Sequence, residues 1–170
     1  MKIVDIFTPT LFAFHYDGEA DNEYDRLMDN WTDVSYLRNY AKNNSIENVN
    51  QFVKDRLKDA EQIQDLLEEI TTNKEPLEYY FRTLFDSESG IKTLSLQKGK
   101  IERNGIRLYA VKIDENCFVI TGGAIKISQA MQDHPDSNKE LTKIKSAKAY
   151  LQENTIVDKD SFYELKNELK

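Results

Sequence analysis

The sequence predicts an α+β domain in which a mostly helical N-terminal half precedes an antiparallel β-meander. Five of the six glycines lie between Gly90 and Gly123, and residues 24–88 contain none. Apolar residues recur every three or four positions in the N-terminal half and every second position after Ile91, which separates helices from strands. The chain of 170 residues is 39% hydrophobic, which suits one packed core, so we expect a single domain spanning residues 1–170.

The N-terminal half begins with an extended segment and continues as helices. Residues 2–16 are rich in Ile, Val, Phe and Thr and contain Pro9, which predicts a short strand or an edge hairpin closed by Asp17-Gly18. Asn22 is the expected N-cap of a helix that ends near Asn43-Asn44. This helix carries one apolar stripe, formed by Tyr24, Leu27, Met28, Trp31, Val34, Leu37 and Ala41.

A second, longer helix is predicted over residues 46–70, where apolar residues repeat at helical spacing. We favour its packing on the preceding helix as an antiparallel hairpin, and a coiled-coil surface for a partner is the alternative. Pro76 suits the first turn of a shorter helix that reaches Phe85.

The C-terminal half contains three extended runs, over residues 91–101, 106–113 and 117–127, joined at hairpin spacings. The third run is apolar on both faces and should be the most buried strand, whereas the first two alternate and should show one face to solvent. Gly122-Gly123 lacks the pattern of a phosphate loop, which favours a bulge or a close backbone approach. Ser137 and Glu140 have the spacing of a capping box at the start of a helix, and residues 159–169 form a last short helix.

Several classes of protein are excluded. The apolar stretches are too short for a spanning helix or a signal peptide, so we expect a cytoplasmic protein that does not enter a membrane. The single cysteine, Cys117, excludes an internal disulfide, and neither His15 nor His134 has a second metal ligand at the usual spacing. Acidic residues alternate over positions 17–25 without the pattern of a calcium loop, which indicates a solvated acidic loop. We expect no cofactor or metal.

The charges divide unevenly along the chain. Residues 1–88 contain 19 acidic and 9 basic residues, whereas residues 89–153 contain 7 acidic and 11 basic ones. The basic residues of the second block concentrate on the meander and its turns: Lys92, Lys98, Lys100, Arg103, Arg107, Lys112 and Lys126. They are either a solubilising rim or a surface that faces phosphate.

Arg107 and Tyr109 share one face of their strand, where a guanidinium can clamp a phosphate and a phenol ring can stack on a base. Cleavage of RNA without a metal requires a positioned 2′-hydroxyl, neutralisation of charge on the phosphate and a proton for the leaving oxygen. Lysine and arginine can supply these functions, so a metal-free ribonuclease is one candidate.

The segment KTLSLQKGKIERNGIRLYAVKIDENCFVITGGAIKISQ resembles the C-terminal meander of RelE-type toxins, including their HigB and phage-encoded branches. The similarity covers about residues 91–151, and it implies a RelE/ParE-like fold in the order strand, helices, three strands and helix. In that family the concave face of the meander holds mRNA in the ribosomal A site. The resemblance assigns the family's basic strand to Lys98 and Lys100, its strand arginine to Arg107 and its following lysine to Lys126. This chain is about twice as long as those toxins, is acidic where they are strongly basic, and has an acidic helical extension over residues 1–88. It also has no clear match to the C-terminal tyrosine that some members use, for which Tyr150 and Tyr163 are the candidates. Residues 154–170 form a separate C-terminal segment.

The resemblance implies a toxin of a toxin–antitoxin or mobile-element system that acts as a ribosome-dependent mRNA endonuclease, with an antitoxin, the ribosome and mRNA as partners. Lys98, Lys100, Arg107 and Lys126 would be catalytic, and Lys92, Arg103, Tyr109 and Lys112 would bind RNA. The alternative is a non-catalytic interaction module, including a ParE-like topoisomerase inhibitor, that keeps the fold. Its partner would contact the long helix through Val49, Val53, Leu57 and Ile63.

Overall fold

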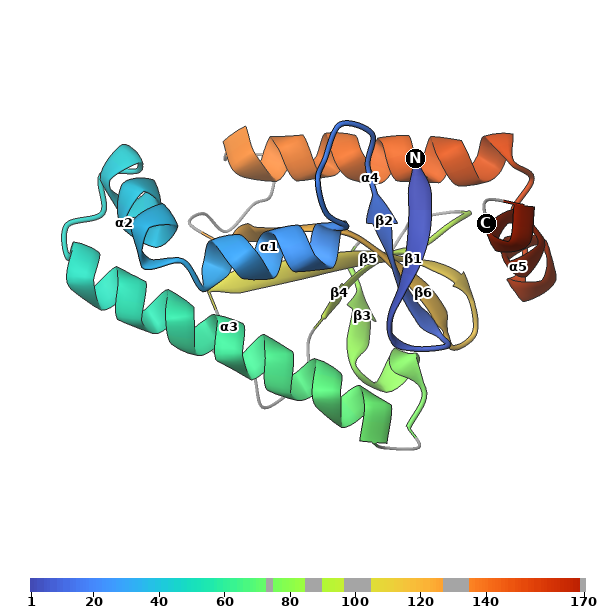
Figure 1. Cartoon of the computed structure of the whole chain (residues 1–170), viewed down its shortest axis with the longest axis horizontal. Helices are drawn as coiled ribbons and strands as arrows, with labels where there is room; N and C mark the ends of the chain where they lie inside the picture. Colours follow the sequence, from blue (N-terminus) through green and yellow to red (C-terminus); the bar gives the residue numbers. More distant parts are fainter. Residues whose placement is uncertain (73–74, 85–89, 97–104, 127–134, 169–170) are drawn as a thin grey trace.

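The computed structural model describes residues 1–72, 75–84, 90–96, 105–126 and 135–168. These residues form an α+β fold with one six-stranded sheet in the order β1-β2-β6-β5-β4-β3 (Figure 1). The elements are β1 (Lys2–Thr8), β2 (Leu11–His15), α1 (Glu23–Trp31), α2 (Val34–Asn43), α3 (Val49–Thr72), a 3-10 helix (Leu77–Tyr79), β3 (Phe81–Thr83), β4 (Thr93–Leu96), β5 (Ile106–Asp114), β6 (Cys117–Ile125), α4 (Pro135–Glu153) and α5 (Lys159–Glu168).

The predicted antiparallel meander is present as β4, β5 and β6. β2 pairs with β6 in parallel, which places the first hairpin beside the last strand and makes the sheet mixed. The hairpin itself is confirmed, but Thr8 pairs with Leu11, so it closes at Pro9-Thr10 and not at Asp17-Gly18. The two residues of this turn leave just enough chain for β1 and β2 to pair.

Helices cover both faces of the sheet (Figure 1). One core cluster joins α1, α2 and α3 to one face, and a second joins α4 and α5 to the other. The expectation that the first two strands of the meander show a face to solvent is therefore wrong, because all four residues of β4 are buried and the centre of β5 is buried as well. The prediction that the third strand is the most buried is confirmed, since every residue of β6 is buried.

The predicted helix after Asn22 is two helices. Asn22 caps α1 as expected, because its side chain accepts a hydrogen bond from the Asp25 amide at 3.1 Å. The chain then breaks at Thr32, and Asp33 caps α2 by accepting from the amides of Ser35 at 2.8 Å and Tyr36 at 3.3 Å. A second capping residue thus starts a new helix inside the predicted apolar stripe. Most of that stripe is buried, but Val34 at the start of α2 is 45% exposed, so its place in the stripe is wrong.

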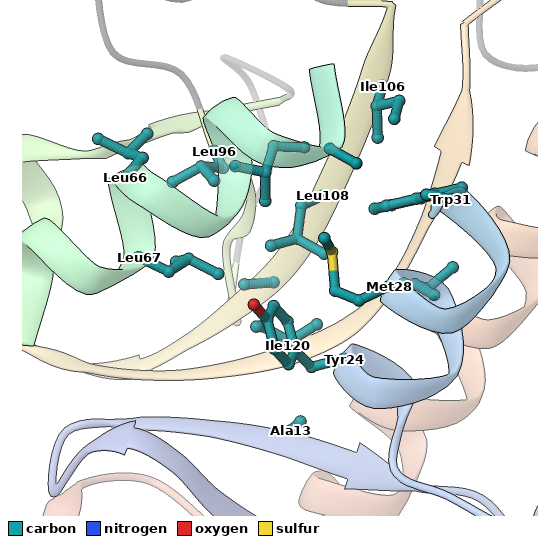
Figure 2. Packing of buried hydrophobic residues seen from close by; sticks show 14 of the residues in the cluster. Ala13, Tyr24, Met28, Trp31, Leu66, Leu67, Leu96, Ile106, Leu108 and Ile120 are labelled. Atoms are coloured by element: carbon teal, nitrogen blue, oxygen red, sulfur yellow. The ribbon is translucent and has the colours of Figure 1, made fainter. Parts of the chain in front are cut away.

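The long helix α3 is confirmed, and it packs against α2 and against the sheet. Figure 2 shows Leu67 of α3 on the side of the helix that faces Leu108 of β5 and Ile120 of β6. The apolar side of α3 therefore contributes to the protein's own core, while its acidic side faces solvent.

The helix predicted from Pro76 to Phe85 is wrong over its described part. A single 3-10 turn is followed by β3, which pairs with β4 from Phe81 to Thr83. Asn116 holds this turn through two hydrogen bonds. Its side-chain Oδ1 accepts from the backbone amide of Leu77 at 2.9 Å, and its backbone amide donates to Glu78 Oε1 at 2.7 Å. Phe85 lies outside the described residues.

Two C-terminal helices complete the fold. α4 begins at Pro135, two residues before the predicted cap, and the side chain of Ser137 lies outside the description. The predicted last helix is confirmed as α5, and it holds the first hairpin in place: the Tyr163 hydroxyl donates to the Pro9 carbonyl at 2.9 Å, and Lys166 pairs with Asp5. Within the described ranges, no helix is long and apolar enough to cross a membrane.

Candidate functional site

Arg107 and Lys126 lie on the same face of the sheet, at the end where β5 begins and β6 stops. Arg107 pairs with Ala124, and the Lys126 amide donates to the Gly105 carbonyl at 2.7 Å. Because side chains alternate along a strand, this register makes Arg107 and Lys126 diagonal neighbours. Both are half-buried.

The other residues predicted to bind RNA are buried, half-buried or paired with another residue, or lie outside the described residues. Tyr109 is 4% exposed and packs against Ala124 and Ile144, and burial raises its pKa to about 12. The prediction that this ring stacks on a base is therefore wrong for the described arrangement, because α4 covers it. Lys112 Nζ lies 3.4 Å from Glu78 Oε1, and Lys92 is half-buried next to β4. Lys98, Lys100 and Arg103 lie outside the described residues.

The face of α3 proposed for a partner points into the protein. Val53 and Ile63 are 5% and 2% exposed, and Val49 and Leu57 are partly buried against the same cluster. These four side chains stabilise the packing of α3 on the sheet, so a partner would have to displace that packing to reach them.

The structure brings together a buried charged cluster that the sequence did not reveal. Glu23 is fully buried at the start of α1, and Arg26 binds both of its carboxylate oxygens, through Nε at 2.8 Å and Nη2 at 3.0 Å. Lys143 of α4 bridges two carboxylates, with Nζ 3.1 Å from Glu23 Oε2 and 3.4 Å from Glu140 Oε1. We refer to Glu23, Arg26, Glu140 and Lys143 as the charged cluster.

The cluster lies where the edge of β6 is open to side chains. β2 pairs with β6 only as far as Ile120, so the described residues provide no strand partner on that side of Thr121–Ile125. The Tyr16 hydroxyl donates to the Thr121 carbonyl at 2.6 Å, and burial together with the two glutamates raises the Tyr16 pKa. The end of β2 thus lets α1 and α4 approach each other across the edge of the sheet.

Glu140 is a buried carboxyl group of the cluster with a raised pKa. It is 6% exposed, and its buried Oε2 has no hydrogen-bond partner among the described residues. Burial, and to a smaller extent the charge of Glu23, raises its pKa to about 7, although Lys143 lowers it. A carboxyl group of this kind exchanges protons near neutral pH, as general acids and bases do.

Gly122 and Gly123 make the close approaches predicted for them, at the bulge where Tyr109 pairs with Gly122 and Ala110 with Ile120. A Cβ atom on Gly122 would collide with Glu140 Oε2 and lie 3.2 Å from Glu23 Oε2. A Cβ atom on Gly123 would lie 2.5 Å from the Arg107 carbonyl oxygen and 2.6 Å from Cη2 of Trp31. The missing side chain of Gly122 therefore lets the two carboxylates lie directly against β6, and that of Gly123 does the same for the indole ring of Trp31.

Beside the cluster, the described residues enclose a pocket of about 180 Å³ between α1, α2, α4 and the end of β6. Three cationic side chains, one carboxyl group and three aromatic rings contribute to its lining, namely Arg26, Lys139, Lys143, Glu140, Trp31, Tyr36 and Tyr40. This composition suits a small anionic ligand that also carries a flat or apolar part.

Sequence reasoning missed this site for identifiable reasons. Glu23 belonged to the acidic segment that predicted a solvated loop. The loop is wrong for Glu23 and Asp25, which lie in α1, and only Glu23 is buried, since Asp17, Glu19, Asp21 and Asp25 are exposed. Glu140 was assigned to a capping box, but α4 begins two residues before Ser137, so Glu140 lies beyond the position that such a box requires. The available signal was that both glutamates precede a basic residue by three positions, at Arg26 and Lys143.

Replacing Glu140 by Gln should stabilise the protein at pH 8 and leave its stability nearly unchanged at pH 5. The raised pKa means that the folded state holds a proton that the unfolded state has released, so the stability from this group is lost as pH rises through about 7. The variant should remove a penalty of about 2–3 kcal/mol at pH 8. Urea unfolding at both pH values measures this effect, and a variant less stable at pH 8 would contradict it.

Comparisons of the chain with family models, with curated proteins and with solved structures find no match. The site is therefore interpreted from its own geometry.

Proposed function

We propose that this protein is a RelE-like toxin of a toxin–antitoxin or mobile-element system, acting as a ribosome-dependent mRNA endonuclease. The observation that supports this most is the register of β5 and β6, which puts Arg107 and Lys126 on one face at the end of the meander. These are two of the four positions that the resemblance assigns to catalysis.

The proposed chemistry uses cations without a metal. Arg107 would clamp the scissile phosphate through two parallel hydrogen bonds, and Lys126 would neutralise charge that develops on its oxygens. Lys98 and Lys100 would transfer protons or stabilise charge. The acidic N-terminal helices pack on the opposite face of the sheet from Arg107 and Tyr109, so they would dock the antitoxin and not shield the basic face.

A second candidate, a non-catalytic interaction module such as a ParE-like inhibitor, is favoured by one observation. Tyr109 is buried beneath α4 and Lys112 is paired with Glu78, which reduces the surface that RNA could contact. The exposed acidic side of α3, including Glu61, Asp65 and Glu68, would then face a basic partner.

Induced expression in a bacterial host separates the two candidates. For the endonuclease, the wild-type protein should arrest growth and produce codon-phased cleavage of a translated message, detected by primer extension. Arg107→Ala should reduce this cleavage by about 10- to 100-fold, because it removes a charge-assisted contact to the reacting phosphate.

The matched control is Arg38→Ala, which removes an exposed arginine of α2 and should leave cleavage unchanged. Undiminished cleavage by a folded Arg107→Ala protein would overturn the proposed site. Intact mRNA with folded wild-type protein would overturn the nuclease and favour the interaction module.

A further inference from the structure

We propose that the pocket between α1, α2 and α4 binds one nucleotide, with the phosphate at Lys139 and Lys143 and the base beside Tyr36 and Tyr40. This inference rests on the proposed function and deepens it, because it adds a nucleotide subsite that the predicted basic residues do not form. The ligand is either a free nucleotide or one unit of an RNA chain.

The charge of the pocket selects an anion. Arg26 and Lys143 share the carboxylates of the charged cluster, whereas Lys139 is exposed at the rim, one residue before Glu140. The pocket and the cluster behind it contain three cations and two glutamates, namely Arg26, Lys139, Lys143, Glu23 and Glu140. With both glutamates ionised, these five groups have a net charge of plus one. A phosphate at the rim would be held by that excess.

The remaining lining suits a base. Tyr36 and Tyr40 are half-buried, and their rings stack with centroids 6.4 Å apart. Trp31 closes the inner side, where Figure 2 shows its ring beside Ile106 at the start of β5. A volume of about 180 Å³ is large enough for a flat base next to these rings.

Glu140 makes the binding sensitive to pH. The groups that face it are Glu23 and Arg26 from α1, Lys143 from α4, Tyr16 from the end of β2 and Tyr109 from β5. Protonation of Glu140 leaves Lys143 with one carboxylate instead of two and raises the positive excess. A phosphodiester keeps its single negative charge between pH 8 and pH 6, whereas a phosphomonoester gains a proton near pH 6. An RNA phosphodiester should therefore bind more tightly as pH falls from 8 to 6.

The experiment uses the fluorescence of Trp31, which is the only tryptophan of the chain and lines the pocket. The protein is titrated with each nucleoside 5′-monophosphate, with a single-stranded oligoribonucleotide, with adenosine and with inorganic phosphate. We expect saturable changes with the mononucleotides or the oligoribonucleotide and far weaker ones with adenosine or phosphate alone. If the oligoribonucleotide binds more tightly than the mononucleotides, the pocket is an RNA subsite. If the two bind equally tightly, its ligand is a free nucleotide.

Lys139→Ala should weaken binding about tenfold, since it removes one charge-assisted contact. The matched control Lys145→Ala removes an exposed lysine of the same helix outside the pocket lining and should bind like the wild type. Glu140→Gln should bind the oligoribonucleotide at pH 8 as tightly as it does at pH 6.

The absence of saturable binding, or equal loss in the two lysine variants, would overturn the subsite. Phosphate binding as tight as nucleotide binding would overturn the assignment to nucleotides. Because codon-phased cleavage and its loss in Arg107→Ala are measured separately, failure of the subsite is distinguishable from failure of the endonuclease.

Discussion

The Gly123→Ala variant is expected to lose about 3 kcal/mol of its free energy of unfolding, because the added methyl group would collide with the neighbouring strand and with the Trp31 ring. Its Cβ would lie 2.5 Å from the Arg107 carbonyl oxygen, which belongs to the paired strand β5. Relief would require β5 and β6 to separate, since a backbone carbonyl cannot rotate away as a long side chain can. Urea unfolding followed by circular dichroism measures the loss.

A double-mutant cycle with Trp31→Phe divides this cost between its two sources. The atoms of Trp31 nearest the new methyl group, Cη2 and Cζ2, are absent from phenylalanine. The double variant should therefore lose less stability than the sum of the two single variants, and the part that persists belongs to the Arg107 carbonyl. A loss below about 1 kcal/mol in Gly123→Ala would contradict the close approach.

The Glu23→Gln variant is expected to lose about 3 kcal/mol at neutral pH, although the new side chain has the same size. Glu23 is the counter-charge that Arg26 and Lys143 share, and its side chain is 1% exposed. Removal of its charge leaves two cations with Glu140 as their remaining carboxylate in the cluster. The pKa of Glu140 should then fall, because the charge of Glu23 helps to raise it.

Chemical unfolding and the NMR titration of Glu140 measure these two effects separately. The matched control is Glu61→Gln on the solvent side of α3, which should change stability by less than about 0.5 kcal/mol. Equal stability of Glu23→Gln and the wild type would mean that the charged cluster does not stabilise the fold.

Local pattern predicted much of the secondary structure. The apolar spacing of α3, the short turn between β5 and β6 and the apolar run of β6 each depend on neighbouring residues, so the sequence was sufficient for them. The exceptions are also local. Asp33 starts a second helix within one continuous apolar stripe, and Pro76 precedes a 3-10 turn and a strand where a helix was expected.

The candidate site was harder to predict because it depends on contacts between distant parts of the chain. Burial of Glu23 requires α4, which lies about 120 residues further on, and a carboxylate in an acidic segment gives no sign of that contact. Burial of Tyr109 likewise depends on α4, since the strand's own alternation is that of a half-exposed strand. Arg107 and Lys126 lie on one face because the pairing of β5 with β6 continues to Gly105 and Lys126.

The parallel pairing of β2 with β6 also constrains how the protein is made. Ala13 and Ile120 are neighbours in the sheet but are synthesised roughly 5–20 s apart, at about 5–20 residues per second. During that interval the first hairpin and the three N-terminal helices expose the apolar side chains that β6 later covers. Because the acidic and basic halves of the sequence share one sheet, a chain cut near Ser89 should yield two fragments that refold only when they are mixed.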